Sequence, residues 1–104
     1  MLAVFKGEWC RQCKKYRQLF SDPRVVKLSE KFVMVLADDK RDAEASRSHM
    51  PDGGYVPRTM FFAPDGQLDE GLRGRHPRYA HFLNNRDASE LLGLMQRAAG
   101  QYGS

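Results

Sequence analysis

Two short apolar runs with a helical pattern between them mark the first half of the chain. Residues 2–5 (LAVF) and 32–37 (FVMVLA) are unbroken apolar stretches, which predict buried strands. Between them, apolar side chains recur at the spacing of one helix face, at Cys10, Cys13, Tyr16, Leu19 and Phe20. The Asp22-Pro23 pair ends this pattern, and one or two further helical turns follow, with Val25, Val26 and Leu28. Strand, helix and strand in this order predict a parallel βαβ unit.

The second half of the chain predicts a hairpin followed by a helix. Residues 38–49 are polar and fit a short exposed helix, and residues 51–54 (PDGG) predict a loop. Residues 58–63 predict a third strand, residues 64–66 (PDG) a tight turn, and residues 67–72 an antiparallel fourth strand. Asp87 followed by Glu90 resembles a capping box at the start of a last helix. This helix is expected to run to about Ala99 and to end at Gly100, with an apolar face formed by Leu91, Leu92, Leu94, Met95 and Ala98.

These elements predict an α/β fold with a central mixed sheet, built as β-α-β and then β-β-α and flanked by helices. The 104 residues fit one domain that spans positions 1–104. The first predicted strand begins at residue 2, which favours further sequence upstream, such as an N-terminal helix or signal segment. We expect this domain to be a monomer.

Charge and hydropathy argue against two classes of partner. The 17 Lys and Arg residues exceed the 13 Asp and Glu residues by four, but along the sequence they are scattered and interleaved with acids. Nucleic-acid binding is therefore not expected, because it needs basic residues gathered into one patch. No apolar run approaches the length that a membrane-spanning helix requires, so we expect no membrane span.

The two cysteines, Cys10 and Cys13, stand two residues apart in the sequence EWCRQCKK. Such a pair can be half of a zinc site, a structural disulfide or a redox-active dithiol. Zinc needs two more ligands, and the three histidines lack the spacing of a zinc finger or ribbon. A disulfide that closes so short a loop adds little stability. A Cys-x-x-Cys near a βαβ unit favours the redox dithiol, with no metal and no cofactor.

The expected position of the pair suits thiolate chemistry. Cys10 is predicted at the first turn of a helix, where unpaired N–H groups favour negative charge. Arg11 and Lys14 add positive charge, so we expect them to lower the pKa of Cys10. Cys13, one turn further on, is expected to be more buried. Cys10 is therefore the predicted nucleophile, and Cys13 the thiol that resolves the mixed disulfide.

A second motif, Tyr55-Val56-Pro57-Arg58, precedes the third predicted strand. Proline lacks the N–H that a central strand uses for pairing, so its place at the strand start needs an explanation. An ordinary trans proline is one interpretation, and a cis Val56–Pro57 bond is the other. The Cys-x-x-Cys upstream favours the cis form, which would leave the Val56 backbone free to pair with an extended peptide. We expect Trp9, Val56 and Pro57 to bind substrate.

Together, WCRQC and PDGGYVPRTMFFAPDG resemble the thioredoxin superfamily, and within it the anterior-gradient proteins and a small endoplasmic-reticulum relative. The resemblance implies disulfide exchange on protein clients, with Pro57 as a cis-proline beside the dithiol. It implies a location in the secretory pathway, in the endoplasmic-reticulum lumen, or in the bacterial periplasm. Glutathione or a thioredoxin-type protein is the expected redox partner.

The chain departs from the thioredoxin pattern at two places. Many thioredoxins have a buried acid six residues before the first cysteine, and here that position is Val4. Glu8 or Lys6 could assist proton transfer instead. The residues between the cysteines are Arg11 and Gln12, neither the Gly-Pro of reducing thioredoxins nor the Gly-His of isomerases. Two functions therefore stay open, a protein thiol–disulfide oxidoreductase or isomerase, and a client-binding adaptor or chaperone with little turnover.

Overall fold

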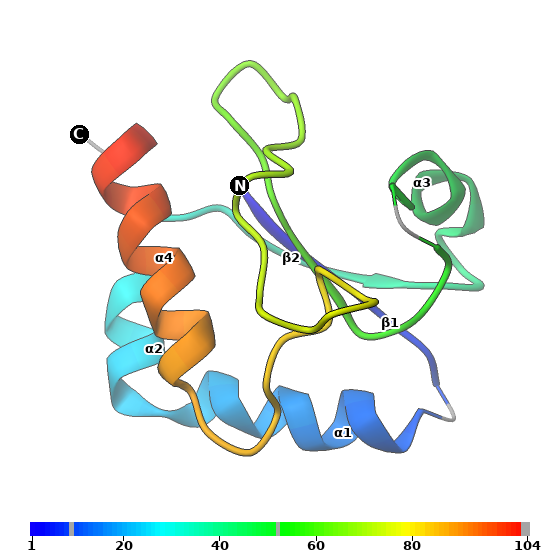
Figure 1. The fold of residues 1–104 in the computed structure, drawn as a ribbon, viewed down its shortest axis with the longest axis horizontal. Helices are drawn as coiled ribbons and strands as arrows, with labels where there is room; N and C mark the ends of the chain where they lie inside the picture. Colours follow the sequence, from blue (N-terminus) through cyan, green and yellow to red (C-terminus); the bar gives the residue numbers. More distant parts are fainter. Residues whose placement is uncertain (9, 52, 103–104) are drawn as a thin grey trace.

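The computed structural model describes residues 1–8, 10–51 and 53–102 (Figure 1). A three-stranded sheet has helices on both sides. The elements in chain order are β1 (Leu2–Lys6), α1 (Arg11–Arg17), the 3-10 helix η1 (Gln18–Ser21), α2 (Pro23–Ser29), β2 (Met34–Asp38), α3 (Ala43–Ser48), β3 (Arg58–Phe61) and α4 (Ser89–Tyr102).

The strand order is β2-β1-β3, with β1 in the centre. β1 pairs in parallel with β2, so that Val4 lies opposite Leu36, and antiparallel with β3, where Val4 lies opposite Thr59. The parallel pair is joined through α1, η1 and α2, which confirms the predicted βαβ unit and the mixed sheet of an α/β fold. Because β1 is central, the loop after its C-terminal end lies close to the starts of both α1 and β3.

Two apolar clusters cover the two faces of the sheet. Leu2 and Val4 point to the face covered by α1, α2 and α4, and Ala3 and Phe5 point to the other. The larger cluster contains Tyr16, Val25, Leu91, Leu94 and Met95 from these helices. On the opposite side, the His49 ring beyond the end of α3 contacts the Phe5 ring, with 6.1 Å between centroids. In Figure 1, α4 and α2 lie together at the left, and α3 is separate at the right.

A buried hydrogen bond ties α1 to β3. The hydroxyls of Tyr16 and Thr59 are 2.6 Å apart, and both residues are almost fully buried. Burial raises the pKa of Tyr16 above its usual range, so the phenol stays neutral. This bond fixes the helix that carries the cysteines against the strand that follows Pro57.

The prediction that residues 32–37 form a buried strand is wrong in its burial. β2 is one of the two edge strands, and its apolar residues Met34, Val35 and Leu36 are exposed, as is Val33 before it. A continuous apolar run is typical of strands covered on both faces. Here only Ala37 of β2 is buried. Met34, Val35 and Leu36 belong to neither of the two apolar clusters, so the elements that cover β1 and β3 leave these side chains exposed.

The predicted fourth strand at residues 67–72 is also wrong. The hairpin forms for a short distance, where Ala63 N–H donates to Gln67 O and Asp69 N–H donates to Phe61 O. Only one bridge results, between Phe62 and Leu68. The Asp69 carboxylate then accepts the N–H of Gly71, and this local bond turns the chain away from the sheet.

At the start of α4 the capping-box prediction is half right. Ser89 N–H donates to Asp87 Oδ1, as a capping residue requires. The Glu90 carboxylate does not return to Asp87, because it accepts the N–H groups of Arg75 and Asn84 instead. A Cβ at position 74 would lie 2.6 Å from Glu90 Oε1, so glycine permits the close approach of this loop to α4.

The other end of α4 lies beyond its expected position. The helix continues through Gly100 to Tyr102. The Tyr102 hydroxyl donates to the Asp69 carboxylate, which also accepts a bond from the Gln101 amide. These contacts with a distant loop add a last turn that the local sequence does not predict.

Candidate active site around the Cys10–Cys13 pair

Cys10 and Cys13 are joined in a disulfide at the start of α1. Cys10 is the N-cap residue of the helix, and Cys13 lies in its first turn. The i to i+3 spacing brings the two Cα atoms to 5.2 Å, within the range that a disulfide requires. The helix begins here because the Cys10 sulfur itself caps it, accepting the Cys13 N–H at 3.0 Å.

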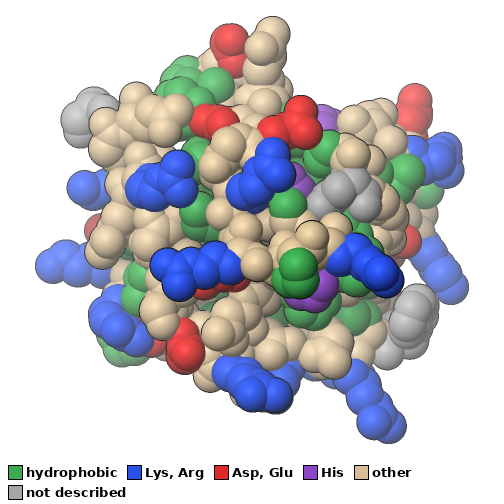
Figure 2. All heavy atoms as spheres, viewed as in Figure 1, with side chains coloured by type: hydrophobic (Ala, Val, Ile, Leu, Met, Phe, Trp, Pro, Cys, Tyr) green, Lys and Arg blue, Asp and Glu red, His purple; other side chains and the backbone are tan. Residues whose placement is uncertain are grey.

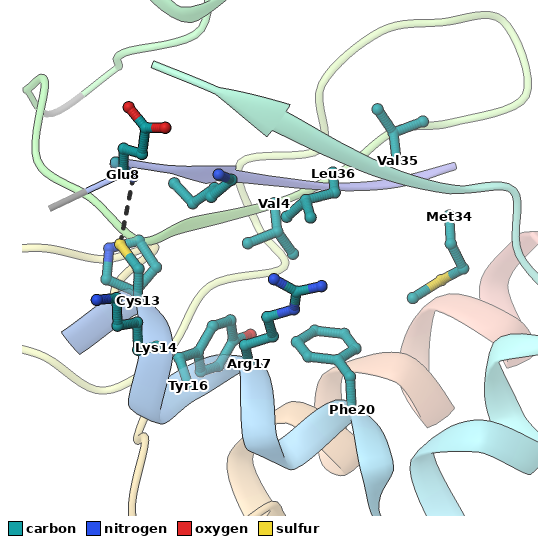
Figure 3. Close-up of a pocket in the computed structure, with 13 residues that line it drawn as sticks. Val4, Glu8, Cys13, Lys14, Tyr16, Arg17, Phe20, Met34, Val35 and Leu36 are labelled. Atoms are coloured by element: carbon teal, nitrogen blue, oxygen red, sulfur yellow. Dashed lines mark hydrogen bonds between the residues drawn. The ribbon is translucent and has the colours of Figure 1, made fainter. Parts of the chain in front are cut away.

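Each sulfur lies near a backbone N–H group. Besides the cap bond to Cys10, the Gly7 N–H donates to Cys13 Sγ at 3.5 Å, shown by the dashed line in Figure 3. N–H groups that point at a sulfur stabilise its anionic form. The shorter bond is made to Cys10, so the geometry favours charge on this sulfur more than on Cys13.

The expected difference in burial between the cysteines is not found. Cys10 is 5% exposed and Cys13 is 6% exposed. Cys10 is covered because its side chain turns inward to cap the helix and faces the Val56 carbonyl, 3.8 Å from the sulfur. Unequal roles for the two thiols must therefore come from hydrogen bonding and charge, because their exposure is the same.

The loop before β3 supplies the other wall of the site. The Val56–Pro57 peptide bond is cis. Pro57 is buried, and Val56 directs its carbonyl oxygen toward Cys10. The structure therefore brings three residues that were predicted from separate motifs, Cys10, Val56 and Pro57, to one place.

An apolar hollow of about 330 Å³ lies beneath the cysteines, between α1 and the sheet edge (Figure 3). Cys13 and Glu8 are at one end, and Met34 is at the other. Val4, where many thioredoxins have an acid, lines this hollow together with Lys6 and Glu8. The Lys6 ammonium forms an ion pair with Asp38 at 3.3 Å. Both substitutes that the sequence suggested for the missing acid therefore border the space next to Cys13.

The expected charged and aromatic residues are placed as follows. Arg11 is the first residue of α1 and is exposed, and Lys14 is exposed and lines the hollow beside Cys13. Trp9 lies outside the described residues. Among the residues that the structure describes, no group of three or more His, Cys, Asp or Glu side chains is arranged to hold a metal ion.

Arg58 is an important residue that the sequence analysis did not single out. It is fully buried in β3, where its guanidinium donates to Tyr55 O at 3.1 Å and to the Ser46 backbone and hydroxyl oxygens. The guanidinium carbon also lies 4.9 Å from the centre of the Phe5 ring. Arg58 therefore fixes the loop before Pro57 against α3. An arginine as the first residue of a predicted strand was the signal that could have identified it.

Two further contacts connect the later loops to the site. The Asn85 side-chain amide donates to the Gln12 side chain at 2.7 Å. Gln12 lies between the two cysteines in the sequence. The Tyr55 ring, next to Val56, packs on Tyr79 with centroids 4.6 Å apart. The segments around Tyr79 and Asn85 therefore border the dithiol, although the sequence separates them from it widely.

Comparison with known proteins agrees with this geometry. A family model described as thioredoxin-like matches residues 1–64. The chain is 28% identical over 101 residues to anterior gradient protein 3 of Xenopus tropicalis, which covers 94% of this chain and 59% of that protein. It is 27% identical over 100 residues to the human anterior gradient protein 2 homolog, covering 94% and 55%. The chain thus spans little more than half the length of these relatives.

A solved structure shows the same fold. The solution structure of a thioredoxin from Thermus thermophilus superposes with a TM-score of 0.71 at 21% identity, covering 98% of this chain and 75% of that one. None of the helices in the described residues is long and apolar enough to cross a lipid bilayer.

Proposed function

Because the chain belongs to the thioredoxin-like family, we propose that it is a thiol–disulfide oxidoreductase or isomerase that acts on protein clients through Cys10 and Cys13. The observation that carries this proposal is the disulfide at the N-cap of α1, with the Val56 carbonyl 3.8 Å from Cys10 Sγ. A dithiol in this place has N–H groups to stabilise a thiolate, and the partly exposed Val56 lies beside it for a client.

The proposed reaction begins with the reduced protein. The Cys10 thiolate attacks one sulfur of a client disulfide, forms a mixed disulfide, and releases the other client sulfur as a thiolate. The Cys13 thiolate then attacks Cys10 Sγ, which forms the Cys10–Cys13 disulfide and releases the second client thiolate. Two electrons pass from the protein to the client. The reverse sequence oxidises a client dithiol, and an internal client thiol can replace Cys13 in isomerisation.

The client is proposed to bind along the loop before β3. Val56 has a backbone N–H and C=O beside Cys10, and an extended client backbone can pair with them as an added strand does. Pro57 fixes the backbone that follows, since its ring restricts φ. Arg11 and Lys14 are proposed to favour the thiolate by their charge. Trp9 stays a candidate client contact from the sequence alone.

The cycle needs a partner that restores the dithiol. Glutathione or a thioredoxin-type protein is the proposed partner. The proposed compartment is the secretory pathway or the bacterial periplasm, where proteins form and keep disulfides. Antibody staining or cell fractionation of the natural gene product tests the compartment directly.

An alternative function is a client-holding adaptor with little turnover. The observation that favours it is Val4, which is buried and apolar beside the hollow that contains Cys13. Without an acid there, deprotonation of Cys13 depends on Glu8, Lys6 or water. An insulin-reduction assay and refolding of scrambled ribonuclease, each with and without glutathione, separate the two functions. Multiple turnovers support the enzyme, and stable mixed disulfides without turnover support the adaptor.

A further inference from the structure

Exposed cations flank the disulfide on the α1 side. The exposed positions of this helix are Gln12 and four cations, Arg11, Lys14, Lys15 and Arg17. No carboxylate lies within salt-bridge distance of these four side chains in the described part of the chain, where the ion pairs are Lys6–Asp38, Arg24–Asp22 and Arg41–Asp42. In Figure 2, Lys and Arg side chains lie along the lower border, over the α1 helix of Figure 1, and also across the rest of this face.

A second group of cations lies across the site from α1. Residues 73–78 (RGRHPR) contain three arginines and no acid, and Arg75 and Arg78 are exposed. This segment is beside the dithiol because Tyr79 packs on Tyr55, whose neighbour Val56 faces Cys10. Within the described residues, the guanidinium groups of Arg75 and Arg78 have no carboxylate partner at salt-bridge distance.

Arg86 completes this group. Its neighbour Asn85 donates to Gln12, between the two cysteines in sequence, and Arg86 itself is exposed. A polar hollow of about 320 Å³ lies here, lined by His76, Asn85 and Arg86. We name Arg75, Arg78 and Arg86 the basic rim.

Acidic side chains balance this charge only in part. Glu90 lines the same hollow, and its carboxylate accepts the N–H groups of Arg75 and Asn84. Asp87, which is exposed, follows Arg86 in the chain. Glu8 is the only acid between residues 7 and 17. The cations of α1 and of the basic rim, on two segments that are far apart in the sequence, therefore outnumber Glu8, Asp87 and Glu90, the acids of the same segments.

We infer that the preferred clients are acidic polypeptide segments, in which Asp or Glu residues stand next to the reactive cysteine. This inference rests on the proposed function and names its substrate class. A basic surface attracts an acidic client before contact, and such steering raises association rates by about 10- to 1000-fold at low salt. Polypeptide clients are favoured over nucleic acid because the basic rim borders a thiol-reactive group, which nucleic acid cannot engage.

The test uses two disulfide-linked peptide dimers with a central cysteine, one with two Asp on each side and the other with two Lys on each side. The rate constant for reaction with the reduced protein is divided by that for dithiothreitol, a neutral dithiol, to remove intrinsic peptide reactivity. We expect the normalised rate to favour the acidic peptide by about tenfold at 20 mM salt. The ratio of the normalised rates for the acidic and the basic peptide should fall toward one at 1 M salt, where the screening length is about 3 Å.

Charge reversal shows whether the basic rim causes the preference. The variant Arg75→Glu, Arg78→Glu, Arg86→Glu leaves the proposed thiol-tuning residues of α1 intact and should lose most of the preference. The control Lys27→Glu, Lys31→Glu, Arg97→Glu changes the net charge equally at exposed positions on or next to α2 and α4. It should keep the preference. The inference would be overturned by equal normalised rates for the two peptides with the unmodified protein. It would also be overturned if both variants lost the preference for the acidic peptide to the same extent.

A binding arm separates this inference from the proposed function. Labelled peptides with Ser in place of Cys cannot exchange, and fluorescence anisotropy measures their affinity. If neither disulfide peptide reacts but the acidic Ser peptide binds through the basic rim, the oxidoreductase proposal fails and the acidic-client inference stands. If a labelled single-stranded DNA binds through the rim more tightly than the acidic peptide, the surface recognises nucleic acid and the inference is wrong.

Discussion

The carbonyl oxygen of Val56 lies 3.8 Å from the sulfur of Cys10, although 46 positions separate the two residues in the chain. This contact places the loop that is proposed to hold a client against the sulfur that is proposed to attack it. It depends on β1 being central, because α1 follows one end of β1 and the Val56 loop precedes the strand paired beside it.

The two cysteines should differ in reactivity. Cys10 accepts the closer N–H, at 3.0 Å against 3.5 Å for Cys13, and Arg11 is adjacent to it. A pKa lowered by one unit corresponds to about 1.4 kcal/mol and roughly tenfold more thiolate near neutral pH. Cys13→Ser should therefore be alkylated about tenfold faster at pH 7 than Cys10→Ser, and should trap clients as mixed disulfides. Faster alkylation of Cys13 would reverse the assigned roles.

Replacement of Pro57 by Ala should affect large substrates more than small ones. Pro57 borders the hollow beside Cys13, and its ring restricts the backbone that follows Val56. A protein client needs that backbone for pairing, whereas a small disulfide needs only the sulfur. We expect the exchange rate with insulin to fall several-fold more than the rate with oxidised glutathione. Equal decreases for both substrates would indicate that Pro57 has a structural role alone.

Arg58→Met should destabilise the fold and loosen the Val56 loop. The buried guanidinium holds Tyr55 O and the Ser46 oxygens, and its removal leaves these acceptors without that donor. Loss of buried charged hydrogen bonds costs about 3 kcal/mol, measured as the free energy of unfolding in urea. Arg41→Met is the control, because the Arg41–Asp42 pair is exposed and such pairs contribute less than about 1 kcal/mol. Similar losses in both variants would contradict a special role for Arg58.

Asp38 should stabilise the protein at neutral pH and lose this effect in acid. The N–H groups of Arg41 and Lys40 donate to its carboxylate and lower its pKa from 3.8 to about 2. Because the pKa is lower in the folded state, the stabilisation is present above pH 3.8 and is lost as the pH falls toward 2. Asp38→Asn should therefore lower the urea midpoint at pH 7, and the difference from the unmodified protein should narrow below pH 3.8. A difference that is constant with pH would exclude this linkage.

The exposed edge of β2 should promote self-association at high concentration. Val33, just before β2, is 68% exposed, and Val35, within it, is 38% exposed; in the described part of the chain the outer edge of β2 pairs with no strand. Exposed apolar edge strands pair readily with other chains. Light scattering should increase with concentration, and Val33→Lys with Val35→Lys should suppress the increase. The control Val26→Lys, at an exposed position on α2, should leave the increase in light scattering unchanged. A monomer at all concentrations would agree with the original expectation from the sequence and contradict this prediction.

Local patterns in the sequence determined the first half of the fold and the pair of cysteines that forms the disulfide. The apolar run at residues 2–5, the helical spacing from Cys10 to Phe20 and the Asp22-Pro23 boundary all correspond to observed elements. These features are short-range, because a strand pattern, a helix face and a Cys-x-x-Cys motif are each complete within a few residues. The pairing of two cysteines three positions apart likewise needs one helical turn and no distant contact.

The tertiary structure alone decided what surrounds that pair. The sequence could not show that Val56 faces Cys10, that Asn85 binds Gln12, or that Arg58 is buried between Ser46 and Tyr55. It also predicted a fourth strand and a buried β2, because local propensity does not reveal which strand the rest of the fold leaves uncovered or where Asp69 turns the chain. Strand order, edge position and contacts across the chain arise from packing between distant segments, so they exist only once the whole sheet and its helices have assembled.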